Sequence, residues 1–173
     1  MYTYITSGTY YFLKQVMEKN PNEKILMMQN AETSQIWHET KGSTVFQSPR
    51  KYEVILAVGP LENKGFAAVN HIPVREEGRP VFEYNFTESM KKAESFPGFK
   101  AIRVLRPLTN DSYIVMTIWQ NEDAYHVWKK SPAFADAHKN VSALESVKSH
   151  SVFSGPSYVK LFVLGDEELD DSK

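Results

Sequence analysis

Three side chains in the second half of the sequence could together hold a ligand: Asn70, Trp128 and His138. Asn70 interrupts the apolar stretch GFAAVNHIPV, and a buried amide needs a hydrogen-bond partner. A histidine can bind a metal ion through a neutral imidazole nitrogen. None of the three side chains is an evident nucleophile or strong base, which disfavours hydrolysis. The set is typical of a site where a bound cofactor performs the chemistry and the protein supplies a ligand, a shape and one polar contact.

Each residue taken alone also has a purely structural interpretation. Trp128 could fill a core, and His138 could be an ordinary histidine on a helix face. The sequence contains no Gly-rich phosphate loop, no GxSxG, no HExxH and no paired-cysteine motif. The interest of the three residues therefore depends on whether the fold brings them together.

The segment that must position two of them is WQNEDAYHVWKKSPAFADAHKN, residues 119–140. Ser131 and Pro132 interrupt it, because the residue before a proline avoids helical angles and proline suits the first position of a new helix. In one straight helix, Trp128 and His138 would lie ~15 Å apart along the axis and about 80° apart around it. The predicted break between two short helices lets both side chains face one cleft.

Composition excludes several classes of function. The 173 residues are 42% hydrophobic, with 20 basic and 21 acidic side chains scattered along the chain. This pattern argues against a nucleic-acid-binding surface and against a polybasic membrane anchor. The absence of cysteine excludes disulfides and thiolate ligands. No signal peptide or run of transmembrane length is evident, so a cytoplasmic protein is expected.

The first half of the chain is predicted to mix strands and helices without a converging set of reactive side chains. We expect strands at 2–6, 24–29, 35–39 and 44–47, and helices at 10–19 and 48–59. The second half has the predicted order strand 65–74, helix 76–95, strands 99–106 and 113–120, the double helix, and a final strand 157–164. This order is β-α-β-β-α-β, a ferredoxin-like plan, which the first half follows incompletely.

The expected fold class is therefore α+β, with an internal pseudo-repeat. Residues 1–64 form the predicted N-terminal α+β half, and residues 65–165 form a second, ferredoxin-like domain. Residues 166–173, which are rich in acidic side chains, are expected to be a disordered, solvated tail.

With these residues located, the second half resembles the antibiotic-biosynthesis-monooxygenase (ABM) family. Within that family it is similar to the IsdG-type heme-degrading monooxygenases, specifically the longer HmoB-like members. The likeness is carried by VNHIPV, EGRPVFE, PGFKAIRVLRPL, TIWQNEDAYHVWKKSPAFADAHK and FSGPSYV, and in the first half by GTYYFLKQV and HET-GSTVFQSP-YEVI. WKKSPAFADAHK is the most specific segment, since it holds Trp and His at the family's spacing. The chain also resembles the staphylococcal TRAP proteins, through RVLRP and SP-YEVI.

The resemblance implies a role for each candidate residue. His138 would be the axial ligand of heme iron, Asn70 would donate a hydrogen bond on the opposite side of the heme, and Trp128 would press on the porphyrin and favour a ruffled ring. Apolar side chains are expected to line the pocket; they are Ile72, Phe86, Val104 and Phe134.

The resemblance also implies an architecture and a reaction. Ordinary ABM proteins dimerise to build a β-barrel, so the first half is expected to complete the barrel within one chain, giving a monomeric pseudo-dimer with one heme site. The expected activity is heme degradation with heme as both substrate and cofactor, O2, and an external reductant or reductase as electron donor, with release of iron. The alternatives are a non-catalytic heme-binding or heme-buffering protein, a TRAP-like stress or regulatory protein, and a cofactor-independent quinol monooxygenase.

Overall fold

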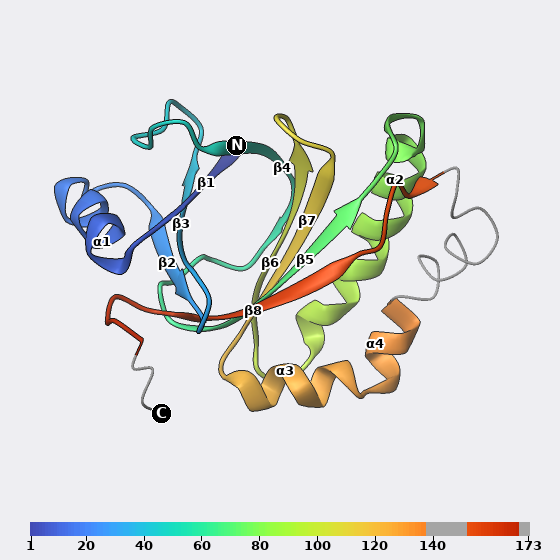
Figure 1. The fold of residues 1–173 in the computed structure, drawn as a ribbon. Coiled ribbons are helices and arrows are strands. Elements are labelled where there is room, and N and C mark those ends of the chain that lie inside the picture. Colours follow the sequence, from blue (N-terminus) through green and yellow to red (C-terminus); the bar gives the residue numbers. More distant parts are fainter. Residues whose placement is uncertain (138–151, 170–173) are drawn as a thin grey trace.

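A computed structural model describes residues 1–137 and 152–169 of the chain (Figure 1). The strands are β1 (Tyr2–Gly8), β2 (Ile25–Gln29), β3 (Ser34–Thr40), β4 (Arg50–Val58), β5 (Gly65–Pro73), β6 (Phe99–Pro107), β7 (Ser112–Trp119) and β8 (Tyr158–Leu164). The helices are α1 (Tyr10–Lys19), α2 (Arg79–Met90), α3 (Glu122–Lys129) and α4 (Pro132–Ala137), with short 3-10 turns η1 (Glu76–Gly78) and η2 (Lys91–Ser95) flanking α2. None of the helices in these residues is long and apolar enough to cross a membrane.

The strands form a closed antiparallel barrel in the order β1-β3-β2-β8-β5-β7-β6-β4, which β4 closes by pairing with β1. The first half contributes β4-β1-β3-β2 and the second half contributes β8-β5-β7-β6. When the strands are numbered separately within each half, both halves have the same order: the fourth strand, then the first, the third and the second. The predicted α+β class, the ferredoxin-like plan and the completion of a barrel by the first half are therefore confirmed.

Strand alternation separates an interior core from two exterior cores. In β5, Ala67 and Val69 belong to the cluster inside the barrel, whereas Ala68 and Ile72 belong to the cluster on its outer face. Helix α2 and the angled pair α3 and α4 lie over this outer face of the second half (Figure 1). Helix α1 covers the first half, where Leu13 packs into a smaller third cluster.

The first half has no counterpart of the α3–α4 pair. Residues 41–49 connect β3 to β4 without a helix, and Phe46 from this connection is buried against Tyr4 and Leu13. His38, which β3 directs to the same outer face, is fully buried and bonded to Glu23 and Thr44. This side of the first half is therefore packed with its own side chains.

Two predicted elements of the first half are wrong. The segment expected as helix 48–59 contains strand β4, which pairs with β1 and β6, and no strand forms at 44–47. The register of β4 against β6 shifts between Val54 and Leu56. This irregularity breaks the alternation that identifies a strand, while Ser48 and Pro49 imitate the start of a helix.

A buried ion pair and a short C-terminal segment connect the halves. Arg103 of β6 donates a hydrogen bond to Glu39 of β3 at 2.7 Å, and their side chains are 7% and 10% exposed. Residues 166–169, from the predicted tail, contact the first half: the Gln29 side chain donates to the Glu167 carbonyl at 2.7 Å and accepts from the Leu169 amide at 3.0 Å. The division into domains at residues 64 and 65 stays a prediction.

Candidate functional site

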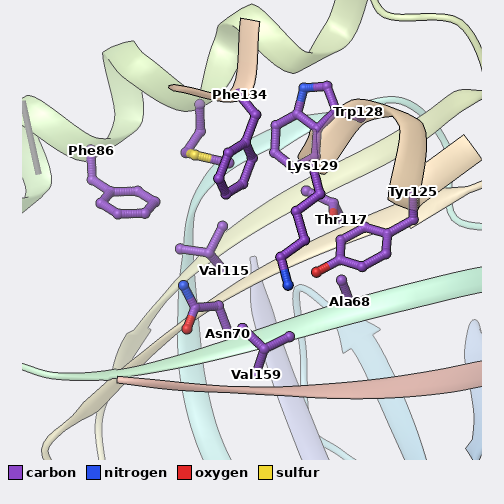
Figure 2. Close-up of a pocket in the computed structure, with 11 residues that line it drawn as sticks. Ala68, Asn70, Phe86, Val115, Thr117, Tyr125, Trp128, Lys129, Phe134 and Val159 are labelled. Atoms are coloured by element: carbon purple, nitrogen blue, oxygen red, sulfur yellow. The ribbon is translucent and has the colours of Figure 1, made fainter. Parts of the chain in front are cut away.

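A cleft lies between the outer face of the second-half sheet and the helices that cover it (Figure 2). Its cavity volume is about 120 Å³, and the cleft is partly open to solvent. Ligand pockets of proteins commonly fall between about 300 and 1,000 Å³, so the described residues enclose only part of the space that a large ligand needs. The lining residues are Ala68, Asn70, Phe86, Met90, Val115, Thr117, Tyr125, Trp128, Lys129, Phe134 and Val159. The cleft is mostly apolar and aromatic, with a few polar groups.

Asn70 lies on the floor of this cleft. Its neighbours across the sheet are Val115 on β7 and Val159 on β8, and both also line the cleft. The Oδ1 atom of Asn70 is buried and has no hydrogen-bond partner among the described residues. A buried polar atom left unpaired costs about 1–3 kcal/mol, so Asn70 is a candidate for contact with a ligand. Rotation of the amide can present either its donor or its acceptor to the cleft.

Trp128 forms one wall of the cleft and is held by two aromatic neighbours. Its ring centroid lies 5.0 Å from that of Trp119 and 4.8 Å from that of Phe134, the latter in an edge-on arrangement. Only 3% of Trp128 is exposed. Helix α3, which carries it, begins at Asn121, whose side chain accepts a hydrogen bond from the Ala124 amide at 2.9 Å.

The predicted break between two helices is confirmed. Helix α3 ends at Lys129, and α4 starts at Pro132. The Ser131 hydroxyl accepts from the Phe134 amide at 3.2 Å and donates to the Trp128 carbonyl at 2.6 Å. This capping turn directs α4 back over the sheet and places Phe134 beside the indole (Figure 2).

The structure thus brings Asn70, Trp128 and Phe134 to one cleft, together with Phe86 from α2. His138 directly follows α4 and lies outside the described residues, so its role as a ligand stays a prediction.

Two expected lining residues occupy the adjoining core instead. Ile72 and Val104 are 3% and 0% exposed, and both belong to the hydrophobic cluster under the helices. Neither is among the residues that line the cleft. Ile72 shares the outer face of β5 with Asn70, but lies one pleat further along the strand.

Sequence reasoning missed other lining residues. Tyr125 and Lys129 flank Trp128 on one face of α3, and the other missed residues are Ala68, Met90, Val115, Thr117 and Val159. Positions i, i+3 and i+4 of a helix are neighbours on its surface, and this spacing could have placed Tyr125 and Lys129 beside the cleft.

The polar groups of the cleft differ in their electrostatics. Burial raises the pKa of the Tyr125 phenol, so its hydroxyl is protonated at neutral pH. Thr117 accepts a hydrogen bond from the Trp119 indole at 2.9 Å. Lys129 is exposed at the edge of the cleft. In the described part of the chain, no group of three or more His, Cys, Asp or Glu side chains could hold a metal ion.

A polar network fixes α2 on the sheet below the cleft. Arg106 of β6 bonds both carboxylate oxygens of Glu83, at 2.6 and 2.9 Å, and also Glu53 at 3.0 Å. Hydrogen bonds from Arg106 lower the pKa of the Glu83 carboxyl despite its partial burial, and Tyr113 also donates to Glu83. Glu83 lies one helical turn before Phe86, so the network positions this wall of the cleft.

A barrel of two ferredoxin-like halves, with an apolar cleft under the helices of the second half, defines a class of α+β barrel protein. The profile of the antibiotic biosynthesis monooxygenase family matches residues 65–140. The Staphylococcus aureus signal transduction protein TRAP is 34% identical over 133 residues, which cover 77% of this chain and 80% of TRAP. Residues 65–140 therefore match an antibiotic biosynthesis monooxygenase domain, and the chain as a whole belongs to the family of longer proteins that includes TRAP.

Three further similarities extend the comparison. A heme-degrading monooxygenase of Listeria monocytogenes is 26% identical over 129 residues, or 75% of this chain and 77% of that protein. The solved structure of a major regulator of staphylococcal pathogenesis has a TM-score of 0.83 at 30% identity, covering 95% of this chain and 99% of that one. The heme-degrading enzyme LmHde from Listeria monocytogenes, at 21% identity, shares the fold with a TM-score of 0.73 over 95% of this chain and all of its own.

Proposed function

We propose that this protein degrades heme, taking heme as its substrate with dioxygen and an external electron donor, and releasing iron. The observation that carries the proposal is the cleft, which combines aromatic walls with the buried Asn70 Oδ1 that no described residue satisfies. Such a site suits a flat apolar molecule with one polar atom near its centre. The similarity to the Listeria heme-degrading monooxygenase supports heme as that molecule.

The lining residues have separate tasks in this proposal. Trp128 and Phe134 lie against the flat substrate and exclude water from it. Asn70 offers its amide from the sheet side and orients the polar group near the centre of the ring. His138 is the proposed axial ligand, through a neutral ring nitrogen. Reduced heme itself supplies the capacity to bind and activate dioxygen.

A second candidate function is a TRAP-like regulatory role without heme turnover. The observation that favours it is the identity to TRAP, 34%, against 26% for the Listeria enzyme. A fold can persist while its chemistry changes, so this difference gives the alternative real weight.

Heme titration followed by reduction in air distinguishes these functions. Wild type is expected to bind one heme per chain, with a Soret band that decays after a reductant such as ascorbate is added. His138→Ala and Asn70→Ala are expected to lose the decay, whereas His126→Ala, which removes an exposed histidine bonded to Glu122, retains it. A stable Soret band in wild type would indicate heme storage. Absence of a Soret band would overturn the proposal and leave the TRAP-like role.

A further inference from the structure

The two ends of the cleft differ in polarity. Phe86 and Phe134 lie at one end, beside α2 and α4 (Figure 2). Tyr125 and Lys129 extend from α3 at the other end (Figure 2). Figure 2 shows the Lys129 amine and the Tyr125 hydroxyl directed to the same place, beside Ala68. A ligand that fills the cleft therefore meets apolar groups at one edge and two polar groups at the opposite edge.

Neither polar group is engaged elsewhere within the described residues. The Lys129 ammonium lies 5.9 Å from the centre of the Tyr125 ring, and no described residue pairs with it as an ion or accepts a hydrogen bond from the Tyr125 hydroxyl. Two pairs of ionisable side chains lie nearby, Lys92 with Asp136 at 2.9 Å and His126 with Glu122 at 3.4 Å. As far as the described residues extend, the edge of the cleft therefore carries a positive charge and a hydrogen-bond donor that have no partner for a carboxylate to displace.

We propose that Lys129 and Tyr125 form a carboxylate-binding subsite that orients the ligand within the cleft. The ligand class is a flat, apolar molecule with a carboxylate on one edge. The proposal rests on the proposed function, because heme has two propionates on one edge of its ring. The ammonium supplies the charge, and the phenol donates a hydrogen bond to the same carboxylate.

The subsite would determine which part of the ring lies above Asn70. A flat molecule held only between apolar walls can rotate in its own plane. An ion pair at one edge removes this freedom, so the same atoms are presented to the Asn70 amide each time. Lys129 is thus a positioning residue, and its loss is expected to broaden the distribution of ring-opened isomers as well as to weaken binding.

Matched acid and neutral probes test the subsite without requiring turnover. Binding is followed by quenching of tryptophan fluorescence, using protoporphyrin IX against its dimethyl ester and 1-pyrenebutyrate against its amide. Wild type, Lys129→Met, Tyr125→Phe and the control Lys130→Met are compared at low and high salt. Lys130 is the adjacent exposed lysine and does not line the cleft.

In wild type we expect each acid to bind more tightly than its neutral partner, by roughly 3- to 10-fold at low salt and less at high salt. Lys129→Met should abolish the preference, Tyr125→Phe should reduce it, and Lys130→Met should keep it. Equal binding of acid and neutral probes by wild type, or an unchanged preference in Lys129→Met, would overturn the subsite. If only the pyrene pair binds and shows the preference, the subsite stands, and the heme titration described above decides the proposed function separately.

Discussion

At the scale of single residues, the cleft holds one amide that the fold itself does not use. Natural cores pair almost all of their buried polar groups, so an unpaired one reflects a demand other than stability. Asn70 is such a residue, since its Oδ1 has no partner in the described part of the chain. Its position at the centre of the cleft floor, between Val115 and Val159, indicates that this demand is ligand binding.

Asn70→Leu is therefore expected to separate stability from function. Leucine removes the unpaired acceptor, so the free energy of unfolding should increase, or should decrease by less than about 1 kcal/mol. Heme turnover should fall at least tenfold. Urea denaturation of the ligand-free protein and Soret decay measure the two effects. A loss of several kcal/mol on substitution would show that Asn70 has a structural role instead.

The adjacent His71 points into the barrel and gives a prediction about pH. It is 5% exposed and stacks on Tyr158 with ring centres 4.7 Å apart. Burial lowers the pKa of His71 from its ordinary 6.5 to about 4, and the positive charges of Lys160 and Arg50 add to this effect. As the pH falls from 6.5 toward 4, the unfolded chain takes up a proton that the folded chain refuses, so this residue makes stability decline over that range.

His71→Phe keeps an aromatic ring against Tyr158 but cannot take up a proton. Urea midpoints at pH 8 and pH 5 should differ less in this variant than in wild type. If the urea midpoint falls by the same amount between pH 8 and pH 5 in both proteins, His71 does not contribute to the loss of stability at acid pH.

At the scale of elements, local signals determined which segments sequence reasoning identified correctly. The break at Ser131 was predictable because a serine before a proline both ends one helix and caps the next. Strand β4 was not predictable in this way. Its irregular register at Val54 removes the apolar–polar alternation of a strand, and its pairing with β1 and β6 depends on residues far away in the sequence. The structure places Asn70, Trp128 and Phe134, which the sequence singled out, around one cleft. Lys129 was missed, although its helical spacing from Trp128 could have placed it there.

Ser131→Ala tests whether the turn between α3 and α4 positions the cleft wall. Loss of the cap should lower the free energy of unfolding by about 1 kcal/mol, and should also weaken heme binding because Phe134 loses its fixed place beside Trp128. Asn121→Ala removes the equivalent cap of α3 and should have a similar effect on stability, without the same direct effect on Phe134. Isothermal titration calorimetry measures the heme affinity of each variant, and urea denaturation measures its stability. Unchanged heme affinity in Ser131→Ala would show that the turn does not position the wall.

At the scale of the whole molecule, each half contributes four neighbouring strands to one barrel, and neither half closes the barrel alone. All eight of the described strands have a neighbour on both sides, although β2 and β8 pair only at Met28–Leu164 and Gln29–Val163, so the barrel closes within one chain. We therefore expect the protein to remain a monomer. Light scattering should give a mass near 19.8 kDa, and a mass near twice this value at working concentration would contradict the expectation.

The buried Arg103–Glu39 pair is the clearest polar connection between the halves. Glu39→Leu should lower the free energy of unfolding by about 3–5 kcal/mol, because it leaves the Arg103 charge buried without a counter-ion. The double variant Glu39→Leu, Arg103→Met should recover part of the loss. Glu62→Ala, which breaks an exposed pair with Lys100, should cost less than about 1 kcal/mol. Equal losses in Glu39→Leu and Glu62→Ala, measured by urea denaturation, would contradict this role.

The repeated strand order has a consequence for how the chain can change. In a barrel made of two identical subunits, every substitution appears twice, so a residue cannot serve catalysis on one side and packing on the other. Here the halves are separate stretches of one chain, and the same topological position can diverge. One half keeps an open cleft under α3 and α4, and the other fills the matching place with Phe46 and His38. A barrel built within one chain thus lets the side chains of the first half serve packing alone, because the cleft makes no demand on them.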